Sequence, residues 1–320
     1  VDIRILGHPE LGSTASRAQT GEFDMLVNGG GKLTLIFQAA DYITVHRSVE
    51  APWEDYLVLD DVAMSERDPA PDQVDLSQPG MKVSLGELEQ DADGQRRSVL
   101  LIDESVQINA FDAAGAPVIV GDQVTFGQVE HTVGPLGPNA MPANLPAFNA
   151  YNLCFSFELL EASAQGATRI EFNPPLIHYV DNFQQLEPGF EIATGSYDPV
   201  LARWEAEDNS LVVRILQEQG GLAVLDVGSG QPATPAPLEA LYEPGGELVR
   251  CRVPHFSYWD FNPAPVPPND AITPRCIPDD HRRCGCPCDE EEVVTEQVHV
   301  ESLSLPGVPD DLTYASDRTP

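Results

Sequence analysis

The stretch GEFDMLVNGGGKLTLIF, residues 21–37, decides the fold because apolar and polar side chains alternate on both sides of a triple glycine. Alternation is the period of a strand with one buried face, and glycine readily adopts the positive φ angles of a tight turn. Residues 21–28 and 32–37 are therefore predicted to pair as an antiparallel β-hairpin. The apolar face of the first strand holds Phe23, Met25 and Val27.

Neighbouring segments extend this pattern. Residues 42–49 and 56–64 are rich in aromatic and aliphatic side chains and predict two further strands, separated by a proline that cannot donate to a ladder. In residues 1–11, Ile3 and Ile5 alternate with charged residues, which predicts a strand whose other partner lies upstream of this sequence. Together the segments predict a small antiparallel sandwich that is truncated at its first strand.

Composition limits the partners that the chain can bind. It has 320 residues, of which 42% are hydrophobic, enough to fill two or three cores. Its 51 acidic residues outnumber 17 basic ones and give a net charge of −34, so we expect no binding to nucleic acid or to an anionic membrane surface. No apolar run approaches the ~20 residues of a membrane-spanning helix. No signal-peptide pattern follows residue 1, so we expect any export signal upstream.

The rest of the chain also predicts strands. Short alternating segments recur between residues 98 and 262, and helix is expected only near residues 159–164. Residues 65–97 are rich in acids and proline, which predicts a solvated linker. The predicted fold class is mostly β, with two or more antiparallel sandwich-like domains, little helix and an extended C-terminal linker.

Motifs at both ends of the chain resemble one protein family. In the first 64 residues they are GEFDM (21–25), NGG (28–30), LTLIF (33–37), PW (52–53) and VAM (62–64). They are similar to the carboxypeptidase-regulatory-type, or fibronectin-plug, domain that precedes the YD-repeat shell of teneurins and bacterial Rhs proteins. The sequences QVHVESLSLPG (297–307) and LTYASDR (312–318) resemble the beginning of that shell. Motifs between the ends, including VPHFSYWD (253–260), resemble a β-rich module of bacterial YD-repeat proteins.

The resemblance implies a domain order and a mechanical role. The order is a truncated plug-like sandwich (1–64), an acidic linker (65–97), a β-rich module (98–262), a Pro/Cys-rich linker (263–295) and the start of the shell (296–320). It implies a piece of a large bacterial protein, secreted or on the cell surface, whose plug seats against a toxin-enclosing shell of the same polypeptide. Trp53 and Tyr56 would meet the inner strands of that shell, and repeated Tyr-Asp units would follow residue 320.

An extracellular binding or adhesion module is the second class of function that we consider. It depends on the run PHFSYWDF, residues 254–261, because an exposed aromatic run could hold a carbohydrate or a protein partner. The run directly follows an alternating strand at residues 248–253, so packing in a core is the favoured interpretation. The candidate surface residues are His255, Phe256, Tyr258 and Trp259.

No motif of a known catalytic or nucleotide-binding site occurs in the sequence. The patterns GxSxG, HExxH and the phosphate loop are absent, and the triple glycine opens a strand, not the helix N-terminus that would hold phosphate. Cys154 lies in an apolar strand, where burial would raise the pKa of a thiol, so we interpret it as a free core cysteine. We therefore expect no enzyme activity and no required cofactor.

The acidic sequence EQDADG, residues 89–94, is a weak candidate for calcium binding. It spaces its acids as the start of an EF-hand loop does. The twelfth position, which requires a bidentate glutamate, is instead Leu100. An acidic turn before a strand is therefore the favoured interpretation.

A cysteine cluster near the C-terminus is the sharpest local signal. Cys276, Cys284, Cys286 and Cys288, with His281 among them, could bind zinc, but C-x-C-x-C departs from the usual C-x-x-C knuckle. In a secreted protein disulfides are favoured, with Cys276 paired to one of the other three, because neighbouring C-x-C cysteines pair poorly with each other. Zinc and unpaired thiols stay open as alternatives.

Overall fold

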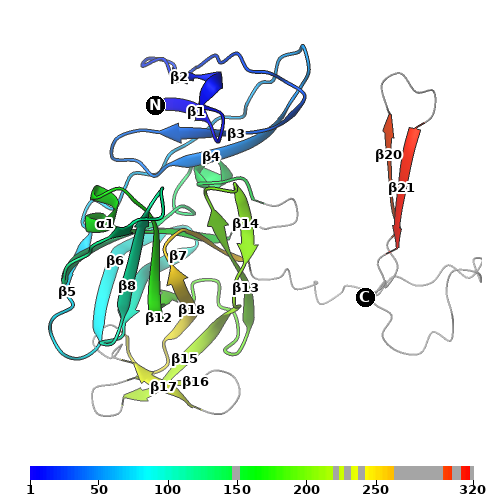
Figure 1. The fold of residues 1–320 in the computed structure, drawn as a ribbon. Coiled ribbons are helices and arrows are strands. Elements are labelled where there is room, and N and C mark those ends of the chain that lie inside the picture. Colours follow the sequence, from blue (N-terminus) through cyan, green and yellow to red (C-terminus); the bar gives the residue numbers. More distant parts are fainter. Residues whose placement is uncertain are drawn as a thin grey trace, which may run out of the picture. The chain divides into compact units, whose positions relative to one another are not determined.

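The computed structural model describes residues 1–145, 152–218, 223–226, 232–236, 242–262, 298–304 and 311–317. The chain forms two units, Val1–Pro265 and Val266–Pro320 (Figure 1). Strands dominate both, and the described residues include one short α-helix, so the predicted mostly β fold is confirmed. Among the described residues, no helix has the length and apolar character needed to cross a membrane.

A four-stranded antiparallel sheet forms the N-terminal part of the first unit, and we call it the N-terminal sheet. Its strands follow the order β2-β1-β3-β4. Ile3, Ile5, Leu35, Phe37 and Val45 form its buried core. Strand β1 pairs with β2 on one edge and β3 on the other, so the partner strand expected upstream is supplied by residues within the sequence. The strands are β1 (Asp2–Ile5), β2 (Ser13–Ala15), β3 (Gly31–Gln38) and β4 (Val45–Ala51).

The pairing predicted for residues 21–37 is wrong, although the predicted burial is right. Residues 21–28 form no strand, and β3 pairs with β1 and β4. Arg17 explains the difference, because its side chain binds both Glu22 and Asp24 and its backbone N–H donates to the carbonyl of Glu22. The apolar side chains still face inward: Phe23, Met25 and Val27 pack against the core of the N-terminal sheet.

Residues 56–64 also lack the predicted strand. Their inward side chains, Leu59, Val62 and Met64, nevertheless pack against the same core. The alternation therefore identified which side chains are buried, but not which backbone groups pair.

A larger sheet occupies the rest of the first unit, and we call it the second sheet. Its main path is β5-β10-β11-β19-β13-β15-β18-β12-β7-β6, and every pairing within it is antiparallel. Five more strands extend this path: β14 pairs with β13, β16 pairs with β15 and carries β17, and β8 pairs with β12 and carries β9. The helix α1 (Leu160–Ala164) lies where the sequence predicts one.

The strands of the second sheet, with those of the C-terminal unit, have the following bounds. They are β5 (Asp72–Asp75), β6 (Lys82–Asp91), β7 (Gly94–Ile102), β8 (Gln107–Asp112), β9 (Pro117–Val118), β10 (Gln123–Glu130), β11 (Leu153–Leu159), β12 (Ala167–Asp181), β13 (Glu191–Asp198), β14 (Arg203–Ala206), β15 (Ser210–Glu218), β16 (Ala223–Asp226), β17 (Pro232–Ala236), β18 (Glu247–His255), β19 (Tyr258–Asn262), β20 (Val298–Ser304) and β21 (Asp311–Asp317).

Residues 65–97, predicted as an acidic linker, contain β5, β6 and the beginning of β7. The acids that suggested a linker mostly lie on exposed or half-exposed faces of these strands, whereas Val74 and Ser84 point into the interior. A hydrogen bond from the Leu85 N–H to a carboxylate oxygen of Asp72, 2.9 Å long, links β6 to β5. We call residues 1–64, which contain the N-terminal sheet, the N-terminal domain. The first strand of the second sheet, β5, therefore begins only a few residues after this domain ends.

The second sheet curls so that β6, at one end of its path, contacts β5 and β10 at the other end. Buried polar side chains cross this seam. Gln128 on β10 donates to Ser84 on β6 at 3.1 Å and accepts a hydrogen bond from Ser98 on β7 at 2.6 Å. Close by, the fully buried Arg96 donates to Glu130 at 2.7 Å.

Arg96 also explains the acidic turn at residues 89–94. Its two terminal nitrogens each lie 2.9 Å from a carboxylate oxygen of Asp91, and the ring of Phe183 covers its guanidinium at 4.3 Å. Such bidentate, charge-assisted hydrogen bonds fix both partners. The Asp91 carboxylate is thus used inside the fold, as the favoured acidic-turn interpretation expects.

Both faces of the second sheet are buried where β7, β12, β15 and β18 run side by side. Leu100, Val180, Val212 and Val249 face the larger core cluster. Their sequence neighbours face a second cluster on the opposite face, to which β16, the strand paired with β15, contributes Leu225. In the C-terminal unit, β20 pairs with β21 as an antiparallel hairpin, and a strand is confirmed where the start of the shell was predicted.

We predict that Gly29→Ala destabilises the protein, because a Cβ at Gly29 would lie 1.9 Å from the carbonyl oxygen of Pro52. Main-chain atoms cannot move aside cheaply, so we expect a loss of about 1 to 3 kcal/mol in the free energy of unfolding. Gly31→Ala is the matched control, since a Cβ there meets nothing within 4 Å. Urea unfolding of the three proteins tests this, and equal stabilities for both variants would contradict it.

Candidate functional site

The N-terminal sheet meets the second sheet through the edge of β4, within the first unit. We call this contact the junction; it joins residues 43–48 and 63–67 to residues 139–144 and to Tyr197 and Tyr258. An edge strand presents unpaired backbone donors, which are costly if they are buried without partners. Here the His46 N–H donates to the carbonyl of Pro142 at 2.7 Å, and the Ser48 N–H donates to the Asn144 side chain at 2.7 Å. Residues 139–144 therefore complete the edge of β4.

Arg47 binds the same loop with its side chain. It is buried, and its terminal nitrogens donate to the carbonyls of His46 at 2.9 Å and Asn139 at 2.8 Å. Burial lowers the pKa of Arg47 to about 10, which still leaves the guanidinium charged at neutral pH. The Ala63 N–H donates to the same Asn139 carbonyl at 3.1 Å, so one peptide group of the loop holds two segments of the N-terminal domain.

An aromatic cluster forms the second sheet's side of the junction. Tyr197 stacks on Tyr258 with ring centroids 5.8 Å apart, and Trp204 meets Tyr197 edge-on at 5.3 Å. Their polar atoms point to the junction: Tyr258 donates to the carbonyl of Thr44 at 2.8 Å, and the Trp204 indole donates to the carbonyl of Asn144 at 2.8 Å. The Tyr197 hydroxyl lies 3.1 Å from Nδ1 of His46. The cluster thus binds the N-terminal domain and is not an open platform.

This arrangement agrees with the favoured core interpretation of the aromatic run around residue 259, and not with the alternative of an exposed aromatic surface. Trp259 is fully buried in the main core, and Phe256 packs against that core. Tyr258 belongs to the junction, and His255 is partly exposed beside Glu207 at 3.1 Å. The aromatic residues in and between β18 and β19 pack in this way because successive positions of a strand face opposite sides of its sheet. The core interpretation is the one that the structure supports.

A buried histidine, His131, joins the two sheets next to the aromatic cluster. Its Nδ1 lies 2.9 Å from the hydroxyl of Ser65, and its Nε2 lies 3.1 Å from the hydroxyl of Ser156. The ring also meets Tyr258 edge-on at 6.4 Å. Because both ring nitrogens have hydroxyl neighbours, the neutral imidazole satisfies its hydrogen bonds without a charge.

Two further serine–histidine contacts of the second sheet, both among the described residues, lack the geometry of a catalytic triad. Ser98 and His178 are 2.9 Å apart, but both are buried in the core. Glu207 lies 3.1 Å from Nε2 of His255, the same nitrogen that faces Ser196 at 3.5 Å. In a triad the acid binds the ring nitrogen opposite to the nucleophile. The arrangement orients a hydrogen-bond network and does not activate a serine.

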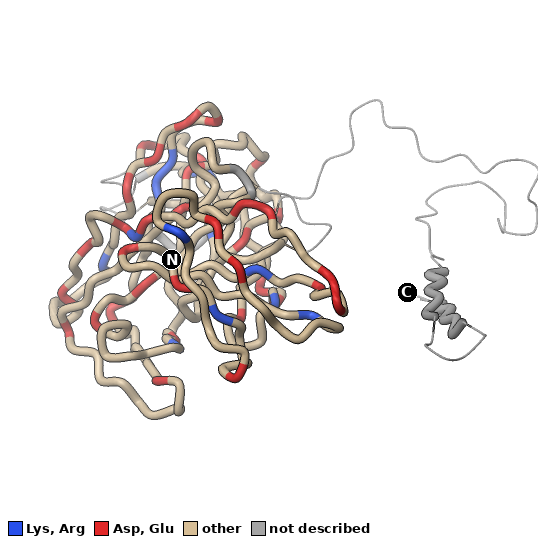
Figure 2. The backbone as a smooth tube through the Cα atoms, turned by 90° about the horizontal axis from the view of Figure 1, so that it is seen from above, with Lys and Arg blue, Asp and Glu red and all other residues tan. Residues whose placement is uncertain are grey.

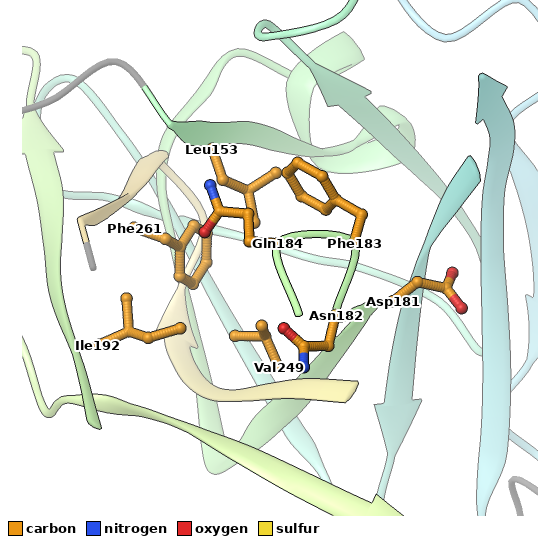
Figure 3. Close-up of a pocket in the computed structure, with 8 residues that line it drawn as sticks. All are labelled: Leu153, Asp181, Asn182, Phe183, Gln184, Ile192, Val249 and Phe261. Atoms are coloured by element: carbon orange, nitrogen blue, oxygen red, sulfur yellow. The ribbon is translucent and has the colours of Figure 1, made fainter. Parts of the chain in front are cut away.

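The first unit contains a cavity beside the junction and a smaller one beneath the loop that follows β12. The larger, about 150 Å³, lies beside the junction between Thr44, Arg67 and Tyr258, where Arg67 pairs with Glu158. The smaller, about 10 Å³, lies beneath the loop that follows β12 and has room for about one water molecule (Figure 3). It is lined by Leu153, Asp181, Asn182, Phe183, Gln184, Ile192, Val249 and Phe261. Among the described residues, no group of three or more His, Cys, Asp or Glu side chains is placed to hold a metal ion.

The other predicted site residues fall in three classes. Trp53 and Tyr56 are exposed, by 69% and 95%, on the N-terminal domain. Cys154 is a free buried cysteine whose pKa burial raises, as predicted. The cysteine cluster lies outside the described residues, so disulfides, zinc and free thiols stay open there. Its members are Cys276, His281, Cys284, Cys286 and Cys288.

The residues of the junction were not predicted from the sequence. His46, Arg47 and Ser48 form a polar run between Val45 and Val49 of β4, and that run is the signal that could have indicated a covered edge. Their partners lie about 90 to 150 residues away, for example Asn139 and Tyr197, so no local pattern connects them.

Comparison with known proteins relates the N-terminal part of the chain to teneurins. Residues 1–64 match the family described as the Teneurin TTR-like domain. Teneurin-3 from Danio rerio is 38% identical over 77 residues, which are 24% of this chain and 3% of that protein. Teneurin-3 from Mus musculus is 35% identical over 77 residues, again 24% and 3%, and Teneurin-1 from Gallus gallus is 36% identical over 64 residues, 20% and 2%. The chain thus spans only a few per cent of the relatives that it matches, and no solved structure matches it.

We predict that the protein loses stability as the pH falls below about 6.5, because three histidines are buried without charge. Burial lowers the pKa of His46 to about 4, with Arg4 and Arg47 contributing, and it lowers the pKa of His131 and His178 to about 3. In the unfolded chain they would take up protons near pH 6.5, so the unfolded state binds more protons at pH 5. Each histidine should cost about 1 to 2 kcal/mol between pH 6.5 and pH 5.

Urea unfolding at pH 7, 6 and 5 measures this loss. Burial also raises the pKa of Glu130, which opposes it in part near pH 5. In His46→Gln the fall should be smaller by the share of one histidine. A free energy of unfolding that stays constant from pH 7 to pH 5 would contradict the prediction.

Proposed function

We propose that this chain is a non-catalytic structural segment of a large YD-repeat protein of the teneurin or Rhs type, secreted or displayed on a bacterial surface. Its N-terminal domain would seat against the β-shell of the same polypeptide, and β20 would lead the chain into that shell. The observation that carries the proposal is the match of residues 1–64 to a teneurin domain that is here fixed to a second sheet.

The junction supports a mechanical role. Backbone and side-chain donors of β4, the buried Arg47 and the tyrosine cluster all contribute to it, so the two sheets can transmit force as one body. A domain tethered by a flexible linker could not hold a fixed position against a shell. The aromatic residues that could have bound a glycan or a protein are used inside the fold, so the adhesion function lacks its proposed surface.

Exposed apolar side chains at residues 53–58 give the N-terminal domain a place to dock. Trp53 is 69% exposed, Tyr56 95% and Val58 91%. Exposed aromatic and aliphatic side chains that follow one another mark interaction sites on soluble proteins. The ring of Trp53 lies close to Gly30, since a Cβ at Gly30 would be 3.4 Å from Cε3 of the indole. The residues proposed to meet the shell are therefore available to a partner.

The test is carried out in the parent polypeptide that contains the shell. Trp53→Ala and Tyr56→Ala should make the N-terminal domain more sensitive to limited proteolysis, because the side chains that would be buried against the shell are gone. Neither side chain is buried within this chain, so the free energy of unfolding of the 320-residue chain should change by less than about 0.5 kcal/mol.

Ile119→Ala is the control for removal of an exposed apolar side chain elsewhere, since Ile119 is 83% exposed and directly follows β9, outside any strand. It should leave the proteolysis pattern unchanged. If Trp53→Ala and Tyr56→Ala are as resistant as the parent, the N-terminal domain does not dock through these residues, and the proposed seat on the shell is wrong.

A further inference from the structure

Residues 55–62, with the sequence DYLVLDDV, have the composition of a strand but no strand partner. From Tyr56 to Val62, no backbone group forms a backbone hydrogen bond with another residue of the described chain. One side-chain contact reaches this backbone, from Asp55 to the N–H of Tyr56 at 2.8 Å. The segment thus carries a row of free donors and acceptors.

The structure holds this segment at both ends. Leu59 and Val62 pack against the core of the N-terminal sheet, and the Ala63 N–H binds the carbonyl of Asn139 at the junction. At the other end Trp53 lies against Gly30. A segment anchored in this way loses little conformational entropy when a partner orders it.

The exposed side chains define the chemistry of the partner. Tyr56 and Val58 point into solvent, and the acidic pairs Glu54–Asp55 and Asp60–Asp61 flank them. A second copy of the chain would bring the same acids opposite these, and like charges directly across a strand pair are destabilising. Acidic residues are spread over the whole first unit, whereas basic ones are sparse (Figure 2), so self-pairing is opposed over a longer range as well. A complementary partner carries Lys or Arg on both sides of an apolar centre.

We propose that residues 55–62 dock by strand addition, pairing their backbone with an exposed sheet edge of the shell that is flanked by Lys or Arg. In such pairing the main-chain hydrogen bonds provide affinity, and alternate side chains provide specificity. The inference rests on the proposed function, because it assigns the shell of the same polypeptide as the partner. It adds that the backbone, and not only Trp53 and Tyr56, forms the contact.

Hydrogen exchange of the amides at residues 56–62 tests the pairing directly. In the parent polypeptide, alternate amides should exchange roughly tenfold or more slowly than in the 320-residue chain, because every second N–H of a paired strand faces its neighbour. High salt should reduce this protection, since it screens the acids from the basic flanks. Equal exchange in the two proteins would overturn the inference.

Proline substitution separates backbone pairing from side-chain docking. Leu57→Pro and Val58→Pro remove neighbouring N–H groups, one of which must face the partner, so one variant should release the segment to limited proteolysis in the parent polypeptide. The matched control is Ile119→Pro, at another exposed position without regular structure, and it should have no effect.

The possible outcomes distinguish this inference from the proposed function. If Trp53→Ala and Tyr56→Ala loosen the domain but both proline variants and the amide exchange are unaffected, side chains alone dock, and strand addition is wrong while the proposed function stands. If none of these changes has an effect, both are wrong. Amide protection that appears in the 320-residue chain as its concentration rises would identify a second copy as the partner and would also overturn the inference.

Discussion

The open edge of β4 is the constraint on which the arrangement of the first unit depends. Two backbone donors, those of His46 and Ser48, bind outside the N-terminal sheet, and the donor of the buried His46 would be costly to leave without a partner. Residues 139–144 satisfy both of them. With this loop at the edge of β4, the Arg47 guanidinium also donates to the carbonyl of Asn139 in the loop. Together these hydrogen bonds fix the orientation of the N-terminal domain.

The rigid base for this contact is the curled second sheet. Its seam is closed by polar contacts between β6, β7 and β10, and the buried Arg96 has carboxylates on two sides. Buried ion pairs of this kind contribute little net stability, but breaking one is costly, so they specify a single geometry. The tyrosine cluster on β13 and β19 therefore meets the N-terminal sheet in one position. A single fixed geometry is the property that a structural segment needs in order to hold a domain in place, whereas a ligand-binding cleft is not required for that role.

The alternation of apolar residues was sufficient to predict the mostly β fold class and the inward-facing side chains, but it could not predict which segments form strands or how the strands pair. Phe23, Met25 and Val27 face the core even though Arg17 holds their backbone out of the sheet. Residues 65–97 were assigned to a linker because acids dominate their composition, yet their acids line the outside of strands. The period of apolar residues depends only on neighbouring positions in the sequence, so it can indicate which side chains are buried. Strand pairing depends on which distant segment lies beside the strand, and the local pattern does not contain that information.

Most of the candidate site could not be predicted from the sequence, because it also depends on contacts between residues that are far apart in the chain. The exposed Trp53 and Tyr56 could be named from a resemblance carried by nearby motifs. The junction could not be predicted from the sequence, because the partners of its polar residues, such as Asn139 and Tyr197, lie far away in the sequence. Tyr258 lies in a run for which the sequence favours a core, but the sequence does not indicate that its hydroxyl binds the N-terminal domain through the carbonyl of Thr44.

Native-state hydrogen exchange at His46 and Ser48 is the most direct test of the account. If residues 139–144 complete the β4 edge, these two amides exchange only when the N-terminal domain and the second sheet unfold together, and their exchange accelerates with denaturant as steeply as that of central core amides such as Leu35. If they instead exchange quickly and independently of denaturant, the edge is open in solution. The two sheets would then be separate domains, which contradicts the claim that they act as one mechanical unit.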